Sequence, residues 1–251
     1  MRYPSTSVKS KWVKTKWLLK KQQTRKYVPN TVLFNRSNLT RMLGKHATVF
    51  FKPTGGSGGF NIHRIKRLAD GYQLQHNAKK TRYPSVEALY AQLKKRSKGR
   101  SYLLQKGIQL ATAGGRPFDI RVMVQKPNSG GWKSTAIFTK IGKAGKVATN
   151  YNQGGKIGYL RHTLAQAHFS PGRITSKEQE LKKMGRTVGH VFDGHSNGFR
   201  ELGLDVALDG KGRSWILEVN TRPQFYPLKQ LKDKRMYRTI IAYAKQYGRK
   251  K

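Results

Sequence analysis

Two periodicities in the apolar positions predict alternating strands and helices along this chain. Period-two alternation predicts a strand at 118–125, because successive side chains of a strand point to opposite faces. Helical spacing predicts a long helix at 175–195, which Thr175 and Glu178 open as a capping box. The same two patterns predict further strands at 47–52, 61–65, 72–76, 102–105 and 132–141, and further helices at 35–43, 85–95 and 228–247.

The order of these elements predicts an α+β fold with two lobes of antiparallel sheet around a cleft. Residues 28–104 form the smaller lobe with a glycine-rich loop, and residues 105–251 form the larger lobe with a basic C-terminal helix. Residues 1–27 form a basic arm, for which we expect a disordered or loosely docked state. The alternative is an arm that Trp12 and Trp17 anchor on the body or on a partner.

The stretch from Glu201 to Arg222 predicts a β-hairpin, because two apolar-alternating runs flank the turn sequence Asp-Gly-Lys-Gly. A turn centred on residues 210 and 211 places Asp205 opposite Ile216. Asp205, Ile216, Glu218 and Asn220 then share one face of the hairpin. The opposite face is almost entirely apolar and is expected to join the core.

Asp205, Glu218 and Asn220 together offer two carboxylates and a carboxamide, which are hard oxygen ligands suited to Mg²⁺ that bridges substrate phosphates. The alternative is a set of polar residues on a half-exposed sheet. The scarcity of acidic residues favours the metal site: between Ala88 and Lys177 the one carboxylate is Asp119.

A glycine-rich loop follows Lys52 at the end of a predicted strand. Backbone N–H groups of glycines can approach phosphate oxygens closely, and the lysine adds a positive charge. The loop connects two strands, which excludes the strand-to-helix context of Rossmann and P-loop sites. A glycine-rich hairpin turn is the alternative. The residues concerned are Lys52, Gly55, Gly56, Ser57, Gly58 and Gly59.

Asp119 and Arg121 share a face of the strand at 118–125. One interpretation is a structural salt bridge. The other is an arginine held for a phosphate or carboxylate, which its guanidinium binds with two parallel hydrogen bonds.

The chain carries 52 Lys and Arg against 11 Asp and Glu, a formal net charge of +41. Such a charge attracts polyanions such as nucleic acids, anionic envelope polymers or membranes. A solvated basic surface without a specific partner is the alternative. A 36% hydrophobic content indicates a folded protein rather than a disordered polycation.

The absence of cysteine excludes disulfides, thiolate metal sites and thiol catalysis. The seven histidines show no metal-ligand spacing, and no nucleophilic triad is recognisable. No secretory signal and no window of transmembrane length occur, so the expected location is the cytoplasm.

Several separated motifs resemble the ATP-grasp superfamily and, more narrowly, its YheC/YheD family of endospore coat-associated proteins. They are KPTGGSGGFNIHRI, LLQKGIQL, GRPFDIRVMVQK and ELGLDVALDGKGRSWILEVNTRP, within a resemblance that covers roughly residues 28–228. The family implies ATP and Mg²⁺ as cofactors, and it implies the mother cell or the spore coat as locations.

The resemblance implies a role for each matching position. Lys52 and Gly55–Gly59 match the phosphate-binding lysine and loop. Gln105, Lys106 and Ile108 match the adenine-binding hinge. Asp119 and Arg121 match the Asp-x-Arg strand, whose arginine faces phosphates or substrate, and Asp205, Glu218 and Asn220 match the Mg²⁺ ligands. Asn150 and Arg222 are the remaining catalytic candidates, Arg222 for a substrate carboxylate.

Two departures from the family bear on activity. Related amino-acid ligases have Arg-Ser-Asn where this chain has Ala148-Thr149-Asn150, and Lys140 or Lys146 could supply the missing charge. Only 51 residues precede Lys52, so we expect a substrate-binding domain to be missing or supplied by a partner.

Three functions follow as hypotheses. The first is an ATP-dependent carboxylate–amine ligase that forms an acyl phosphate on a small-molecule or polymeric substrate. The second is a non-catalytic spore-coat protein that retains the ATP-grasp fold. The third, nucleic-acid binding, rests on charge alone.

Overall fold

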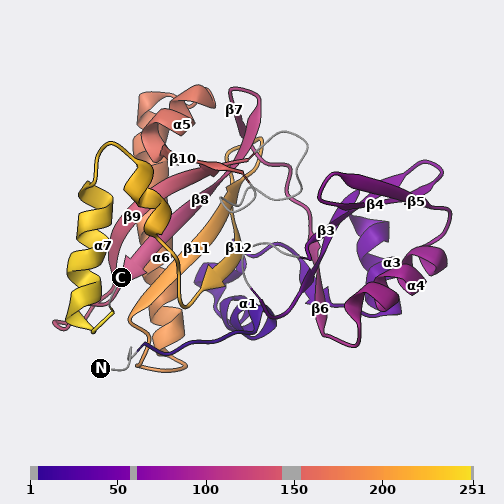
Figure 1. Ribbon diagram of the computed structural model, residues 1–251, viewed down its shortest axis with the longest axis horizontal. Coiled ribbons are helices and arrows are strands. Elements are labelled where there is room, and N and C mark those ends of the chain that lie inside the picture. The colour runs from indigo at the N-terminus through magenta and orange to yellow at the C-terminus, as the bar shows by residue number, and fades with distance from the viewer. Residues whose placement is uncertain (1–4, 57–60, 143–153, 250–251) are drawn as a thin grey trace.

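The computed structural model describes residues 5–56, 61–142 and 154–249, which form two lobes with a sheet in each (Figure 1). The expected α+β class is confirmed. All strand pairs in both sheets are antiparallel.

The small lobe is one sheet with strands in the order β1-β6-β2-β3-β4-β5, covered by two helices. Leu39, Leu89 and Leu93 on the helices pack against Val49, Phe51 and Ile65 of the sheet in one apolar cluster. The strands are β1 Thr31–Leu33, β2 Thr48–Pro53, β3 His63–Leu68, β4 Gly71–His76, β5 Lys79–Tyr83 and β6 Tyr102–Lys106, and the helices are α3 Arg36–Lys45 and α4 Val86–Ser97.

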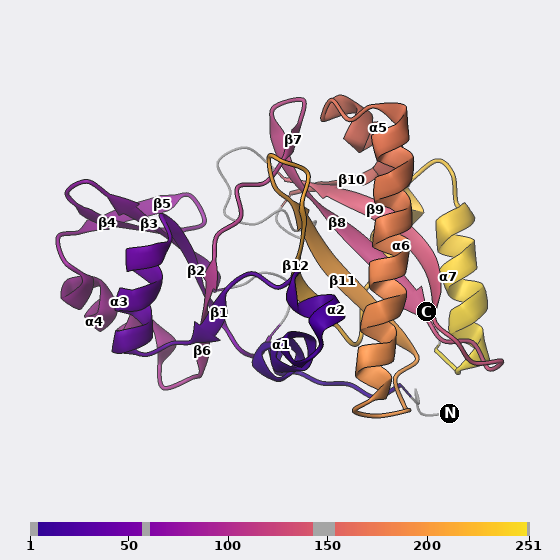
Figure 2. The ribbon, with the colours of Figure 1, turned by 180° about the vertical axis from the view of Figure 1, so that it is seen from behind.

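The large lobe has a sheet in the order β10-β9-β8-β11-β12, with β7 paired to β8 at one side. Helix α6 lies across one face of this sheet and helix α7 lies on the other (Figure 2). The strands are β7 Thr112–Ala113, β8 Arg116–Gln125, β9 Lys133–Ile141, β10 Lys156–Tyr159, β11 Glu201–Leu208 and β12 Ser214–Asn220; the helices are α5 Leu160–Gln166, α6 Pro171–Asp193, the 3-10 helix η2 Tyr226–Gln230 and α7 Arg235–Gln246.

The alternation in β8 explains this layered arrangement. Phe118, Ile120, Val122 and Val124 pack with α6 in the main core, as expected. Met123, on the opposite side, packs with Ile240 of α7 in a separate cluster. Because helices cover both faces, nearly the whole strand is buried.

Helix α6 begins earlier than its capping-box pattern predicted. Pro171 occupies the first turn, where its missing N–H group costs no hydrogen bond. Thr175 and Glu178 therefore lie inside the helix, and both receive hydrogen bonds from Arg161 instead of capping it.

The expectation of a disordered or loosely docked arm at the N-terminus is wrong. Residues Lys11–Lys20 form α1 and Gln22–Arg25 form α2, and α1 packs against β12 and α6. Trp17 stacks on His195 with ring centroids 4.1 Å apart and meets Phe192 edge-on. Leu18 is buried in the main core, so the arm is part of the large lobe.

Candidate nucleotide and metal site

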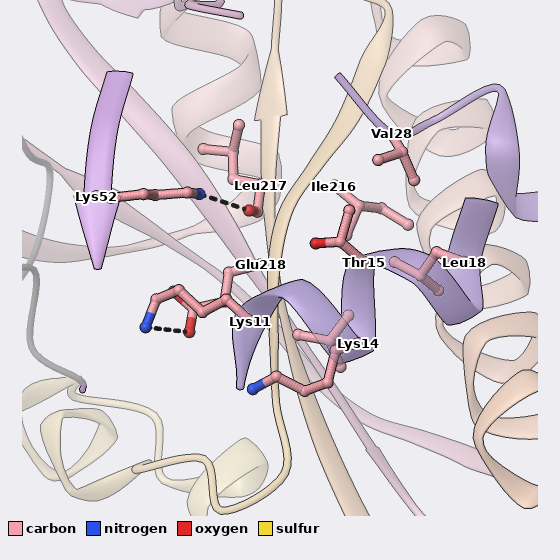
Figure 3. Close-up of a pocket in the computed structure, with 10 residues that line it drawn as sticks. Lys11, Lys14, Thr15, Leu18, Val28, Lys52, Ile216, Leu217 and Glu218 are labelled. Atoms are coloured by element: carbon pink, nitrogen blue, oxygen red, sulfur yellow. Dashed lines mark hydrogen bonds and ion pairs between the residues drawn. The ribbon is translucent and has the colours of Figure 1, made fainter. Parts of the chain in front are cut away.

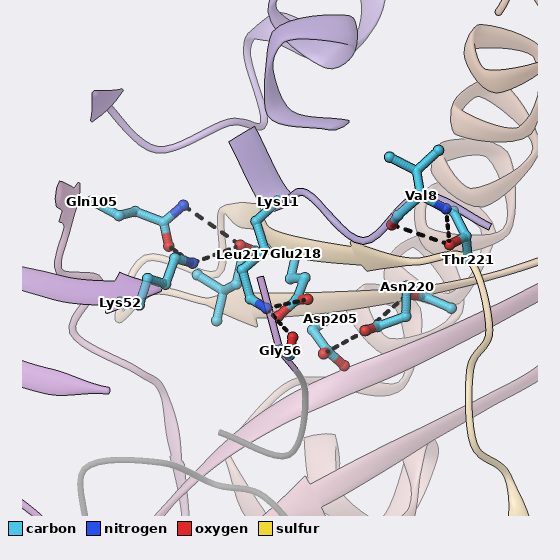
Figure 4. Close-up of polar contacts among 11 residues, drawn as sticks. Val8, Lys11, Lys52, Gly56, Gln105, Asp205, Leu217, Glu218, Asn220 and Thr221 are labelled. Carbon is cyan, nitrogen blue, oxygen red and sulfur yellow. Dashed lines mark hydrogen bonds and ion pairs between the residues drawn. The ribbon is translucent and has the colours of Figure 1, made fainter. Parts of the chain in front are cut away.

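Two acidic side chains lie side by side where β11 pairs with β12, because Asp205 is directly opposite Glu218. We call this pair the acidic wall. Asp205 Oδ1 accepts hydrogen bonds from Arg121 Nε and Lys140 Nζ, each at 2.8 Å. Asp205 Oδ2 accepts one from Asn220 Nδ2 at 3.2 Å. The three expected metal ligands are thus neighbours on one hairpin (Figure 4).

A β-bulge in β12 determines which of its side chains lie on the same face as Glu218. The predicted register placed Asp205 opposite Ile216, whereas Ile216 lies opposite Val206 and the register shifts between Val206 and Asp205. The shift makes Leu217 an extra residue. Ile216 therefore turns into the core with Val219, and its expected place on the Glu218 face is wrong. Alternation of apolar residues cannot reveal such an insertion, because Ile216 and Leu217 are both apolar.

The bulge also exposes a carbonyl group toward the small lobe. Lys52 Nζ donates to Leu217 O at 3.1 Å and to Gln105 Oε1 at 2.7 Å. Gln105 Nε2 in turn donates to Thr31 Oγ1 at 3.0 Å. These bonds join β2, β6 and β12 across the two lobes, and burial lowers the pKa of Lys52 to about 8.

Part of the backbone of the hinge at the end of β6 is already hydrogen-bonded within the protein. Lys106 N donates to Asn30 O at 2.8 Å, and Lys106 Nζ lies 5.3 Å from the centre of the Trp215 ring. Ile108 is half-buried in the segment that leads to β7. The expected adenine contacts at Gln105, Lys106 and Ile108 stay predictions.

Asp119 and Arg121 do not pair with each other directly. Arg121 binds Asp205, and Lys140 lies between Asp205 and Asp119, 2.9 Å from Asp119 Oδ1. Burial raises the pKa of Asp205, but Arg121 and then Lys140 outweigh it and hold that pKa below its usual range. The four groups form a buried network of two cations and two carboxylates.

Other expected residues lie near this wall or outside the described parts. Gly55 and Gly56 follow β2, and Gly56 has a φ of +86°, a conformation that suits glycine. Arg222 is exposed two residues beyond Asn220. Ser57, Gly58, Gly59, Lys146 and Asn150 lie outside the described residues.

The sequence interpretation missed two lysines of α1. Lys11 Nζ lies 3.2 Å from Glu218 Oε1 and donates to Gly56 O at 2.5 Å. Lys14 is buried one turn further along, and burial lowers its pKa to about 8. Lys11, Lys14, Lys52 and Glu218 line one pocket (Figure 3). The spacing of Lys11, Lys14 and Leu18 on one helical face was the available signal, hidden among many other lysines.

The donor set fits a Mg²⁺ ion that shares its coordination with a nucleotide. Among residues 5–56, 61–142 and 154–249, no three His, Cys, Asp or Glu side chains form a metal-binding group. Asp205 and Glu218 supply two carboxylates, and Asn220 adds a carboxamide. Mg²⁺ commonly completes such a partial set with phosphate oxygens and water.

A family model described as YheC/D-like ATP-grasp matches residues 2–250. The chain belongs to the YheC/D-like ATP-grasp family. It is 28% identical over 221 residues to the endospore coat-associated protein YheD of Bacillus subtilis, an alignment of 85% of this chain and 48% of YheD. It is 25% identical to YheC of the same organism, covering 88% of this chain and 63% of YheC. This YheC/D-like chain thus spans about half to three fifths of those relatives.

Solved ATP-grasp structures share its fold. N5-carboxyaminoimidazole synthetase from Staphylococcus aureus, complexed with ADP, superposes with a TM-score of 0.58 at 12% identity, over 97% of this chain and 54% of that one. The ATP-grasp ligase PsnB, complexed with minimal precursor, gives 0.54 at 14% identity, over 94% and 60%. At such identities the likeness establishes the ATP-grasp fold alone.

The helices that the structure describes include none that is both long and apolar enough to cross a bilayer.

Proposed function

We propose that this YheC/D-like chain binds Mg-ATP between its lobes and acts as an ATP-dependent carboxylate–amine ligase associated with the spore coat. The observation that carries the proposal is the meeting of the glycine loop and the acidic wall. A single ammonium group, Lys11 Nζ, contacts both Gly56 O and Glu218 Oε1. Loop and carboxylates therefore border the same space, as phosphate binding with a bridging metal ion requires.

Each group of residues has a proposed role that follows from its chemistry. Lys52 and the loop from Gly55 hold the phosphates, and Gln105, Lys106 and Ile108 border the adenine. Asp205, Glu218 and Asn220 hold Mg²⁺, which when bound neutralises phosphate charge. Asp119 and Lys140 hold Asp205 and Arg121 in place through the buried ion pairs. Arg121, Asn150 and Arg222 serve the substrate carboxylate and the transferred phosphoryl group.

The proposed reaction requires no nucleophilic side chain. A substrate carboxylate oxygen attacks the γ-phosphorus of ATP, and ADP leaves. An amine then attacks the acyl carbon, phosphate leaves with the bonding electron pair, and the nitrogen gives up its proton to the departing phosphate or to water. The protein positions the reactants and offsets their charge, which accounts for most of the rate gain in phosphoryl transfer.

Glu218→Gln tests the metal and nucleotide assignment. We expect wild-type protein to bind a non-hydrolysable ATP analogue more tightly with Mg²⁺ than without it. The variant should lose about tenfold or more of the affinity in Mg²⁺, because it removes one carboxylate ligand while keeping the side-chain shape. Isothermal titration calorimetry measures both affinities.

Glu87→Gln is the matched control, since Glu87 is an exposed carboxylate of α4 in the small lobe. Equal Mg²⁺ dependence in wild type and Glu218→Gln would remove Glu218 from the metal site.

A non-catalytic spore-coat role is the second candidate. The names of both Bacillus relatives, the net charge of +41 and the absence of the ligase-type arginine before Asn150 favour it. An ADP-release screen across amino acids, peptides and anionic envelope fragments separates the two: turnover with any acceptor supports the ligase, and binding without turnover supports the structural role.

A further inference from the structure

Helix α1 is fastened to both walls of the pocket. Lys11 N donates to Thr54 O at 2.6 Å, and Lys11 Nζ bonds Gly56 of the glycine loop. The same ammonium group pairs with Glu218 of the large lobe. A helix that only filled space between the lobes would not require a buried lysine here, because burying a charged side chain is costly. We therefore look for a function of this lysine.

The pocket holds more positive than negative charge. Lys11, Lys14 and Lys52 are 7%, 5% and 6% exposed, and the one carboxylate among the described residues that line the pocket with them is Glu218. The carboxylates of the neighbouring ion-pair network do not offset this positive charge, because Arg121 and Lys140 already lie against Asp205 and Asp119. Within the described residues, no hydrogen bond or ion pair joins Lys14 Nζ to another group, although Lys14 is almost fully buried.

Buried charges are ordinarily paired, because removing them from water is costly. A pocket with three ammonium groups around one carboxylate is therefore built for an anion of more than one charge. Lys11 and Lys14 extend from α1 on the side where Glu218 stands (Figure 3). A polyphosphate bound at Lys52, as proposed above, would meet this positive charge.

We propose that Lys11 and Lys14 of α1 bind the polyphosphate of the nucleotide, so that this helix forms a third wall of the site. The inference rests on the proposed nucleotide binding and adds two ligand-contacting residues that lie outside both lobe sheets. A free metal ion is a poor alternative occupant, since three lysines repel it.

The test compares four forms of the protein at fixed ionic strength. They are wild type, Lys11→Met with Lys14→Met, Lys11→Arg with Lys14→Arg, and a control pair, Lys16→Met with Lys20→Met. Lys16 and Lys20 are exposed positions of the same helix, so the control removes equal charge. Thermal unfolding establishes that each form is folded. Calorimetry then measures binding of tripolyphosphate and of the non-hydrolysable ATP analogue with Mg²⁺.

We expect the Lys11/Lys14 methionine pair to lose about tenfold or more in affinity for both probes, since charge-assisted hydrogen bonds are lost. The control pair should stay within about twofold and the arginine pair should recover most of the affinity, because it retains the charge. Equal losses in the methionine pair and the control pair would overturn the inference. Tighter binding in the methionine pair would overturn it too, because Lys11 would then be an occluding group at the metal position.

Failure of the inference and failure of the proposed function give different results. If binding of the ATP analogue depends on Glu218 but not on Lys11 and Lys14, the inference about α1 is wrong and the proposed function still stands. If tripolyphosphate binding depends on Lys11 and Lys14 but the adenosine group of the analogue adds no affinity, the proposed function is wrong and the anion site still stands.

Discussion

At the residue scale, buried ionisable groups in this protein behave according to their partners. Asp205 stays charged because Arg121 and Lys140 contact it directly. Among the described residues, no charged side chain pairs with His63 of β3, which is 3% exposed and whose ring stacks on that of His76 with centroids 4.5 Å apart. Burial first, and then the charges of His76 and Arg96, lower the pKa of His63 to about 4 against the opposing hydrogen bond to Asn61 O.

This histidine predicts a loss of stability in mild acid. The unfolded chain takes up a proton near pH 6.5 and the folded chain only near pH 4, so the unfolded state binds more protons in that window. The free energy of unfolding should therefore fall as the pH drops from 6.5 toward 4, by at most about 1.4 kcal/mol per pH unit for one group. Denaturant titrations at several pH values measure this slope.

His63→Gln should flatten the slope, whatever it does to the overall stability, because the titrating ring is gone. His162→Gln is the control, since His162 is exposed on α5. A slope in His63→Gln as steep as that of the wild type would show that other groups cause the acid sensitivity.

At the element scale, small departures from regular geometry place the functional groups. The bulge at Leu217 in β12 keeps Glu218 beside Asp205 and frees a carbonyl group for Lys52. Helix α6 uses glycines in a comparable way. A Cβ atom added to Gly189 would lie 2.4 Å from the indole of Trp132, so the bare backbone lets helix and ring pack closely.

Gly189→Ala should therefore destabilise the protein. Overpacking of this kind costs about 1–3 kcal/mol, which exceeds the gain of about 1 kcal/mol that alanine brings to a helix interior. At roughly 2–4 °C per kcal/mol for a chain of this size, the melting temperature should fall by several degrees. Differential scanning calorimetry provides the measurement.

Gly172 in the first turn of α6 is the matched control, because an added Cβ atom there meets nothing within 4 Å. Gly172→Ala should leave the melting temperature unchanged or raise it. The packing explanation fails if Gly189→Ala is as stable as Gly172→Ala.

At the scale of the whole molecule, α1 connects parts of the chain that are far apart in sequence. Its Trp17 packs on Phe192 in the last turn of α6 and on His195 just beyond that helix, while Lys11 touches both lobes at the pocket. Thr221 Oγ1 accepts a hydrogen bond from Val8 N at 3.0 Å, just before the helix begins. The N-terminal segment thus strengthens the junction between the lobes.

Trp17→Ala should loosen this segment without unfolding the lobes, because the substitution removes the aromatic contacts that hold α1. Limited trypsin digestion followed by mass spectrometry should show faster cleavage within residues 9–26 than in wild type. Trp12→Ala is the comparison, since Trp12 is half-exposed on the same helix. Equal cleavage rates in the two variants would contradict the anchoring role of Trp17.

Features that depend on neighbouring residues could be predicted from the sequence. The alternation in β8 predicted both of its faces, the Asp-Gly-Lys-Gly turn predicted the hairpin, and the motifs along the chain identified an ATP-grasp fold. The two carboxylates were expected on one face, and Asp205 and Glu218 do lie opposite each other. Local periodicity suffices for these features because side-chain direction follows directly from backbone repeat.

The details that complete the candidate site depend on how distant parts of the chain pack together. The extra residue at Leu217, the position of Lys140 between Asp119 and Asp205, and the seating of Lys11 against Glu218 each depend on contacts across many residues of sequence. Alternation does not record a bulge, and a lysine-rich arm does not show which lysine will be buried. Those choices are made when separate elements pack together, since burial and ion pairing are properties of the assembled fold.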